Sequence, residues 1–378
     1  MAKKRGAGEG LVRQRADGRW EARLSLGWRN GKRQRHSVYG TTQAEVLDQL
    51  AEARQKHKNG MPIASTGQTV GEFLTHWLED SARPRIRPRT YDRFSELIRL
   101  HLNPALGAVR LEKLSPAHVQ GFMTHKRKEE FAAQTIVSMR NVLRAALNQA
   151  LRWGIVGRNV ATLVDAPRIE RPSLRILTED ETRRLLETAR GKRFEGVYTL
   201  GLALGLRRGE LLGLKWEDVD LDHAQIRIVR SLQRIGKELL LTETKTAKSR
   251  RTLPLPQNAV RALRTHRKRQ LEGRLATGPA WRETDLVFTN STGGPVEPVT
   301  LHRDFKRVLR DTGLPAIRFH NLRHTAASLM LARGVPLKII QEILGHSSIA
   351  VTSGFYAHLT EQLKRDAAEV MDRVLDGR

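Results

Sequence analysis

Two short linker-like segments divide this chain, and they constrain its fold more than any other feature of the sequence. The first, NGMPIASTGQT, spans residues 59–69, and the second, DAPRIERPS, spans residues 165–173. Glycine, proline, serine and threonine favour turns and bury little apolar surface, so such composition is typical of linkers. The chain of 378 residues is therefore expected to form three domains, with boundaries at 1–62, 63–168 and 169–378.

The first segment alternates apolar and polar residues over short runs, which predicts strands. Asp17-Gly18 and Asn30-Gly31 are turn dipeptides typical of hairpins. One strand face would hold Trp20, Ala22, Leu24 and Leu26. The sequence TQAE at residues 42–45 is a capping box that opens a helix running to about His57. We predict a three-stranded sheet followed by one helix.

Arginines line the predicted strands, namely Arg19, Arg23, Arg33 and Arg35. A basic sheet can lie in a DNA groove, which favours DNA contact, and the alternative is a sheet that only packs on its helix.

The second segment has helical periodicity from a capping box, TVGE at residues 69–72, to about Gly154. One apolar stripe comprises Val70, Phe73, Leu74, Trp77 and Leu78, and a second comprises Ile136, Met139, Val142, Leu143, Ala146, Leu147, Ala150 and Leu151. These stripes predict a bundle of about four helices. Before the second helix the sequence ARPRIRPRT supplies candidate DNA contacts, among them Arg85, Arg87 and Arg89.

The third segment is mainly helical, with one patch of strands. A helix is expected to open at residues 178–181, QIRIVR at 225–230 alternates like a strand, and residues 238–243 and 250–255 are predicted to pair as a hairpin. The whole chain is thus expected to be a multidomain protein, mainly α with small β-sheets. Its last domain is expected to be mixed α+β.

The net charge of +27 is spread along the chain, with +8, +6 and +13 in residues 1–60, 61–170 and 171–378. Charge in every segment favours a nucleic acid as partner, because neutralising phosphates releases counterions. Cysteine is absent, which excludes disulfides, zinc fingers and thiol catalysis and fits the cytoplasm. No apolar run approaches the roughly 18 residues of a membrane span. The first residues lack the apolar core of a secretory signal.

Four stretches of the third segment carry groups suited to phosphate chemistry. Gly205 interrupts a helical run in ALGLRRGELLGLKWEDVD, residues 203–220, so Arg207 is expected at a helix start with Glu210 holding it. Lys245 is expected in a hairpin turn in TKTAKSRRTLPL, residues 244–255. Taken alone, Arg207 is more often an ordinary surface residue, and Lys245 is better explained as a generic phosphate-contacting lysine.

The other two stretches are HNLRHTAASLMLARG, residues 320–334, and LGHSSIAVTSGFYAH, residues 344–358. A helix would place His320 and Arg323 on one face. His346 would follow a helix that ends at Gly345, and Tyr356 would lie on the next segment.

His320 and His324 have the spacing of metal ligands. No glutamate of the HExxH kind accompanies them, and Arg323 would repel a cation, so we expect no metal site and no cofactor.

Together the four stretches supply two arginines, a lysine, two histidines and a tyrosine without a cluster of carboxylates. That combination can perform metal-free attack on a phosphodiester: the arginines neutralise the phosphorane, the tyrosine attacks, and either Lys245 or His320 protonates the leaving oxygen.

The stretches GLRRGELLGLKWEDVD, TKTAKSRRTLPL, HNLRH, LGHSSI and FYAHL, in this order, resemble the tyrosine recombinases, specifically phage and integrative-element integrases. The resemblance covers nearly the whole chain and implies an arm-type DNA-binding domain, a helical SAM-like core-binding domain and a catalytic domain. It implies that Arg207 and Arg323 clamp the scissile phosphate, His346 hydrogen-bonds it, and Tyr356 forms a 3′-phosphotyrosine bond. Lys245 would protonate the 5′ oxygen, with His320 assisting and Glu210 in support.

The resemblance further implies double-stranded DNA as partner, with core and arm attachment sites, and a homotetramer on that DNA. It leaves room for a host bending factor and a directionality factor, and for action at the nucleoid of a prokaryotic cell. After the tyrosine, a helical stripe of Leu363, Ala367, Val370, Met371, Val374 and Leu375 would dock on a neighbouring protomer or on its own domain.

Some points stay open in the sequence. Lys248 is an alternative to Lys245, and Gly354 weakens a helix before the tyrosine by roughly 0.5–1 kcal/mol relative to alanine. A type IB topoisomerase uses similar chemistry without strand exchange, although the N-terminal sheet argues against it. A non-enzymatic helix-turn-helix protein is a second alternative, based on residues 332–356.

Overall fold

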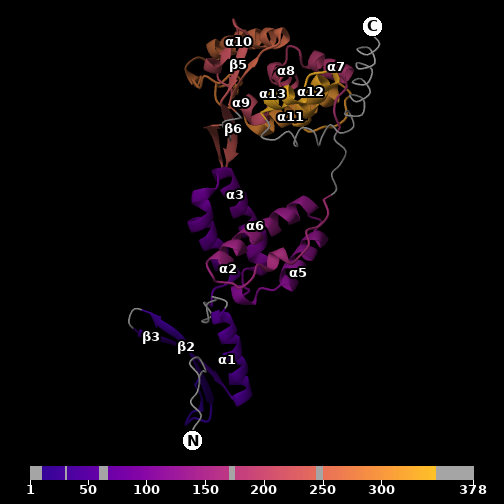
Figure 1. Cartoon of the computed structure of the whole chain (residues 1–378). Coiled ribbons are helices and arrows are strands. Elements are labelled where there is room, and N and C mark those ends of the chain that lie inside the picture. Colours follow the sequence, from indigo (N-terminus) through magenta and orange to yellow (C-terminus); the bar gives the residue numbers. More distant parts are fainter. Residues whose placement is uncertain (1–10, 30–31, 59–66, 170–174, 244–249, 346–378) are drawn as a thin grey trace, which may run out of the picture. The chain divides into compact units, whose positions relative to one another are not determined.

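The computed structural model describes residues 11–29, 32–58, 67–169, 175–243 and 250–345. The chain divides into two compact units, Met1–Arg171 and Pro172–Arg378, and each has its own hydrophobic clusters. Figure 1 follows the elements along the chain. No helix within the described ranges is both long enough and apolar enough to cross a membrane.

The first unit begins with an antiparallel sheet of order β1-β2-β3, formed by β1 (Leu11–Gln14), β2 (Trp20–Arg29) and β3 (Lys32–Gly40) and followed by helix α1 (Gln43–Lys58) (Figure 1). The predicted alternation holds, because Ala22 and Leu24 are buried against α1 and Trp20 packs beside them. The side chain of Leu26 lies outside the described part of the chain.

The start of α1 differs slightly from a full capping box. Thr42 Oγ1 accepts the N–H of Glu45 at 3.2 Å, as expected. The carboxylate of Glu45 accepts the N–H of Thr41 at 2.9 Å, one residue before the expected donor. The helix therefore begins where the sequence predicts, with its first turn closed one residue earlier.

The remainder of the first unit is helical, as the periodicity predicts. Its helices are α2 (Val70–His76), which continues as a π-helical turn (Trp77–Ala82), α3 (Pro88–Leu97), which continues through a π-helical turn (Ile98–Leu102) into α4 (Asn103–Leu106), α5 (Pro116–Lys128) and α6 (Ala133–Arg152), with short 3₁₀ turns at Arg83–Arg85, Leu111–Lys113 and Val160–Thr162. Thr69 and Glu72 form the predicted reciprocal capping box. Both predicted stripes are buried except at Leu151, which is exposed because α6 ends one residue later.

In its described residues the second unit combines helices with two small antiparallel sheets. Its helices are α7 (Glu179–Ala189), α8 (Glu195–Ala203), α9 (Arg208–Leu212), α10 (Gln257–Thr277), α11 (Pro298–Asp311), α12 (Asn321–Ala332) and α13 (Leu337–Leu344), with 3₁₀ turns at Trp216–Asp218 and Gly278–Ala280. One sheet has the order β4-β5-β8, formed by β4 (Val219–Asp220), β5 (Gln225–Ile228) and β8 (Arg251–Pro254), and the other pairs β6 (Arg230–Ile235) with β7 (Glu238–Glu243).

The predicted hairpin between residues 238–243 and 250–255 is wrong. Residues 238–243 pair with β6 across a tight turn at Gly236, whose φ of +56° suits glycine, and β8 pairs with β5 instead. Strand β7 pairs with β6, the nearer strand in the sequence, because a two-residue turn closes a hairpin with little loss of chain entropy. Residues 244–249, between β7 and β8, lie outside the described part of the chain.

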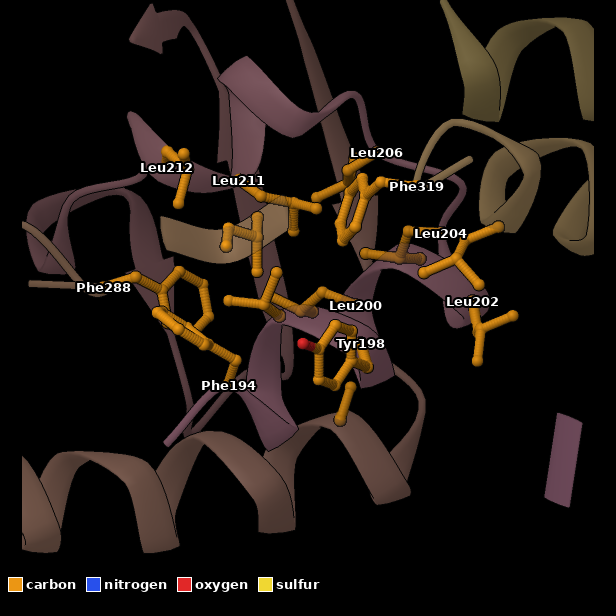
Figure 2. Packing of buried hydrophobic residues seen from close by; sticks show 14 of the residues in the cluster. Phe194, Tyr198, Leu200, Leu202, Leu204, Leu206, Leu211, Leu212, Phe288 and Phe319 are labelled. Atoms are coloured by element: carbon orange, nitrogen blue, oxygen red, sulfur yellow. The ribbon is translucent and has the colours of Figure 1, made fainter. Parts of the chain in front are cut away.

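A large core of leucine, valine and phenylalanine side chains holds the second unit together. Figure 2 shows Tyr198 at its centre, near Leu200 and Phe194. The Tyr198 ring is fully buried, and its hydroxyl donates to Asp304 Oδ2 at 2.6 Å. Burial and the hydrogen bond to Asp304 raise the pKa of this phenol far above its ordinary value. Tyr198 is therefore a core residue whose hydroxyl stays protonated.

Candidate active site

The turn between α8 and α9 places the first predicted phosphate ligand. Gly205 has φ +60°, and a β-carbon built there would lie 2.4 Å from Leu344 Cδ2, so the chain turns where only glycine fits. Arg207 is the N-cap residue of α9, where the sequence places it. Its side chain is 38% exposed, which leaves its guanidinium accessible from solvent.

Glu210 fixes Arg207 from inside the same turn. Arg207 Nη1 donates to Glu210 Oε1 at 2.7 Å, and the Arg207 N–H donates to Glu210 Oε2 at 3.1 Å. The Glu210 side chain is only 3% exposed. This supports the predicted pairing of the two residues and orients the guanidinium.

A further arginine, Arg251, reaches the same carboxylate from β8. Arg251 Nη2 donates to Glu210 Oε2 at 3.1 Å, and its Nε donates to the carbonyl of Ile343 at 2.7 Å. Burial alone would raise the pKa of Glu210, but Arg251 and Arg207 outweigh it and hold that pKa below the ordinary value. Arg251 is not among the residues predicted from the sequence. Its strand position, two residues before the buried Leu253, indicates an inward side chain.

Helix α12 carries the next two predicted residues. His320 is the N-cap residue and has an exposed side chain, whereas Arg323 in the first turn is only 2% exposed. Arg323 Nη1 donates to the carbonyl of Gly205 at 2.7 Å, and Nη2 donates to the carbonyl of Leu344 at 2.7 Å. Arg323 thus joins the α8–α9 turn to the end of α13.

The two histidines of α12 favour their neutral forms. Their rings meet edge to face with centroids 5.0 Å apart. The protein packed around His320, followed by the charges of Arg323 and Arg207, lowers its pKa. Burial, His320 and Arg323 lower the pKa of His324 to about 4. The exposed, neutral imidazole of His320 can accept a proton during a reaction.

Helix α13 ends at Gly345 as predicted, with φ +64° and ψ +49°. Arg207 Nη2 donates to the Gly345 carbonyl at 3.1 Å. Three guanidinium groups and one carboxylate therefore meet at this helix end, which leaves net positive charge for an anion. The remaining predicted residues, Lys245, Lys248, His346 and Tyr356, lie outside the described ranges, as does the tail stripe after residue 360.

In the N-terminal sheet the candidate DNA contact Arg23 binds Glu21, a carboxylate that is not among the residues predicted from the sequence. Glu21 is buried beneath Arg13 and Arg23, with Arg13 Nε at 2.8 Å from Oε2 and Arg23 Nε at 2.7 Å from Oε1. The hydrogen bond from Arg23 is the main cause that lowers the pKa of Glu21 to about 2. Strand register places Arg35 opposite Ser25, on the same face of the sheet as Glu21. Arg19 is exposed and immediately precedes β2. Arg33 pairs with Trp28 in the ladder.

The other candidate contacts lie around the start of α3. Arg85 ends a 3₁₀ turn, Arg87 is the N-cap residue of α3, and Arg89 lies in its first turn. All three side chains are exposed on the first unit. Among the described residues, no three histidine, aspartate or glutamate side chains lie close enough together to hold a metal ion.

Comparison with known proteins identifies the family of this chain. Residues 175–362 match the model of the phage integrase family, and residues 69–126 match that of the phage integrase N-terminal SAM-like domain. An integrase of Streptomyces ambofaciens is 33% identical over 390 residues, covering 99% of this chain and 98% of the relative. A tyrosine recombinase XerC-like protein of Caldanaerobacter subterraneus subsp. tengcongensis is 29% identical over 362 residues, covering 91% of this chain and 93% of the relative.

Solved structures share the fold. The integrase of the Tn1549 transposon in complex with transposon right end DNA has a TM-score of 0.69 at 21% identity, covering 81% of this chain and all of that one. A lambda integrase tetramer bound to a Holliday junction has a TM-score of 0.60 at 19% identity, covering 91% and 94%. The chain therefore belongs to the phage integrase family of tyrosine recombinases, and it is a site-specific DNA recombinase.

Proposed function

We propose that this protein integrates or excises a phage or mobile element by cutting and rejoining DNA through a 3′-phosphotyrosine intermediate and a Holliday junction. The observation that carries the proposal is the meeting of Arg207, Arg323 and Glu210 at the end of α13. The chain leaves this point toward His346 and Tyr356. A cationic site that the protein has already ordered is suited to a phosphorane, because it needs no reorganisation as charge develops.

In this mechanism the oxygen of Tyr356 attacks the scissile phosphorus and the bond to the 5′ oxygen breaks. Arg207 and Arg323 stabilise the pentavalent phosphorane, and His346 hydrogen-bonds it. Lys245 gives a proton to the departing 5′ oxygen, with Lys248 as its alternative, and the neutral His320 assists proton transfer. The phosphotyrosine keeps the bond energy, so rejoining requires neither ATP nor a metal ion.

The other tyrosines support Tyr356 as the nucleophile. The Tyr198 hydroxyl is buried on Asp304, and the Tyr91 hydroxyl donates to Glu79 at 2.5 Å, which raises its pKa. Tyr39 lies in β3 of the N-terminal sheet, beside Glu21. Tyr39 and Tyr91 belong to the first unit, and Tyr198 lies in the hydrophobic core of the second unit.

We further propose the division of labour among three domains with boundaries at 1–62, 63–168 and 169–378. The first would bind arm sites through the arginine face of β1–β3, the second would bind core sites with α3 and its arginines, and the third would cut. Four copies would assemble on two duplexes through the tail after residue 360, with a host bending factor and a directionality factor as partners. The lambda integrase tetramer on a Holliday junction supports this arrangement by its fold. Such a protein would work at the nucleoid.

The experiment that tests the proposal traps the covalent intermediate. A pool of nicked suicide duplexes covering host and element junctions is incubated with the protein in EDTA, followed by denaturing electrophoresis and peptide mapping. We expect an adduct at Tyr356 in the wild type and no adduct in Tyr356→Phe, and we expect the two proteins to bind DNA equally well. Arg207→Ala should cut cleavage by about 10²–10³ with binding retained, since it removes one preorganised donor. An adduct mapped to Tyr39, Tyr91 or Tyr198 would contradict the assignment.

A further inference from the structure

Arg251 is a buried arginine of the second unit that is not among the residues predicted from the sequence. It opens β8, and its side chain is only 8% exposed. The guanidinium spans from the Glu210 carboxylate to the Ile343 carbonyl. A β-carbon at Gly345 would lie 3.0 Å from Arg251 Nη1, so the end of α13 rests against it. One side chain therefore ties β8 to α9 and to α13.

The end of α13 receives three guanidinium groups on three consecutive carbonyls. Arg251 donates to Ile343, Arg323 donates to Leu344, and Arg207 donates to Gly345. The last carbonyls of a helix lack partners within the helix and carry its negative dipole end, so cations bind there favourably. The next residue in the chain is His346, which makes this helix end the anchor of the segment that leads to Tyr356.

The charge arrangement also favours a role for Arg251 beyond packing. A single carboxylate, Glu210, is shared by Arg207 and Arg251. Sharing leaves the pair of arginines with one uncompensated positive charge, and Arg207 is the more exposed of the two. Without Arg251, Glu210 would neutralise Arg207 alone, and the attraction of Arg207 for a phosphate would weaken.

We propose that Arg251 is a positioning residue for DNA cleavage, which fixes Glu210 and thereby Arg207, and which anchors the end of α13 ahead of His346. It acts through these groups and does not touch the phosphate. The proposal rests on the proposed function of this site as the place of cleavage.

The test compares Arg251→Gln with Arg250→Gln, a matched control one residue earlier whose side chain is exposed. Single-turnover adduct formation on the suicide duplexes is measured across pH, together with duplex binding and thermal unfolding. We expect Arg251→Gln to bind the duplex with an affinity within about twofold of the wild type and to cleave at least about tenfold more slowly. This loss is smaller than the roughly 10²–10³ expected when a direct phosphate donor is removed. Arg250→Gln should behave as the wild type.

The pH profile separates positioning from structural damage. Glu210 faces Arg207 at the start of its own helix, Arg251 from β8, and His320 from α12. Removing Arg251 raises the pKa of Glu210, so the cleavage rate of Arg251→Gln should fall at less acidic pH than that of the wild type. Arg251→Lys keeps a buried cation beside Glu210 and should restore the pH dependence of the cleavage rate. It should recover only part of the rate, because one ammonium group replaces a guanidinium that bonds Glu210 and the Ile343 carbonyl at once.

Two outcomes would overturn the proposal while the proposed function stands. One is cleavage by Arg251→Gln at the wild-type rate. The other is a loss that is equal at every pH and that Arg251→Lys shares, which would mark a structural residue. An absence of any adduct in the wild type and in Arg250→Gln would instead refute the proposed function and this inference with it.

Discussion

Glu21 in the N-terminal sheet and Glu210 in the second unit are both carboxylates held by two arginines, among the described residues. Glu21 binds Arg13 and Arg23, and Glu210 binds Arg207 and Arg251. Both carboxylates are almost inaccessible to solvent. Their surroundings differ: Glu21 lies beneath its arginines on the face of the sheet opposite the α1 core, whereas Glu210 lies in α9 next to the buried Leu211 and Leu212.

The arginines differ in the same way. In the sheet the side chains of Arg13 and Arg23 are 50% and 33% exposed, so both can meet a phosphate or a base edge. In the second unit Arg207 is open, while Arg251 is turned inward onto the Ile343 carbonyl. The sheet therefore exposes two arginines to solvent, whereas the second unit exposes Arg207 and keeps Arg251 buried on the same carboxylate. Under the proposed function, the exposure of the arginines would decide whether the same chemistry serves DNA binding or positioning.

The largest expected difference concerns stability. Glu210→Gln leaves a buried cation without its counterion, which typically costs 3–5 kcal/mol, and we expect about 3 because Arg207 is partly solvated. For a unit of this size that corresponds to a drop in Tm of roughly 6–12 °C. Glu21→Gln should lower stability much less, since water reaches both of its arginines.

The measurement is thermal unfolding of the whole chain, with limited proteolysis and peptide mapping to assign the loss to β1–β3 or to the second unit. The double variant should lose the sum of the two effects, because the sites belong to different units. Equal losses in Glu21→Gln and Glu210→Gln would show that the difference in cover has no energetic consequence.

Local signals in the sequence predicted the positions that local chemistry sets. The break at Gly205 located the N-cap of α9, Thr69 and Thr178 located helix starts through their capping boxes, and Gly345 located the end of α13. The alternation in β2 located the face that packs on α1. In each case neighbours within a few residues determine the conformation, so the pattern is sufficient.

Contacts between distant residues could not be predicted in this way. Arg251 lies 41 residues from Glu210, and Arg323 lies 118 from Gly205, so no short pattern links them. The pairing of residues 238–243 was mistaken because both flanking runs alternate and only the turn at Gly236 distinguishes them. Glu21 was overlooked because a lone acid among arginines resembles a solvated charge until the register places it between Arg13 and Arg23.

The two regions should also respond differently to acid. The pKa of His324 is 6.5 in the unfolded chain and about 4 in the folded protein. As pH falls from 6.5 toward 4 the unfolded chain binds a proton that the folded protein does not, so the free energy of unfolding decreases over this range and is unaffected by His324 above pH 6.5. The pKa of Glu21 falls from 4.5 to about 2, so its contribution persists above pH 4.5 and is lost toward pH 2. The second unit should therefore weaken first on acidification, by up to about 1.4 kcal/mol per pH unit for His324.

Hydrogen exchange of the whole chain, corrected for intrinsic rates, measures this difference. Peptides from α12 should lose protection between pH 6.5 and 4.5, while peptides from β2 keep theirs. His324→Gln should flatten the loss in α12, because glutamine does not titrate. Simultaneous loss of protection in β2 and α12 above pH 4.5 would contradict the assignment of this window to the histidine.

The smallest expected effect is a change in salt dependence at the N-terminal sheet. If Arg23 meets a DNA phosphate, Arg23→Ala in the whole chain should reduce the slope of log affinity against log salt concentration by roughly 0.9, measured by fluorescence anisotropy on a duplex of random sequence. Arg54→Ala is the matched control, because α1 covers the opposite face of the sheet. It should leave the slope unchanged, and both variants should cleave suicide duplexes at the wild-type rate. An unchanged slope in Arg23→Ala would contradict a phosphate contact on the arginine face, and Glu21 would then be a structural clamp of the sheet alone.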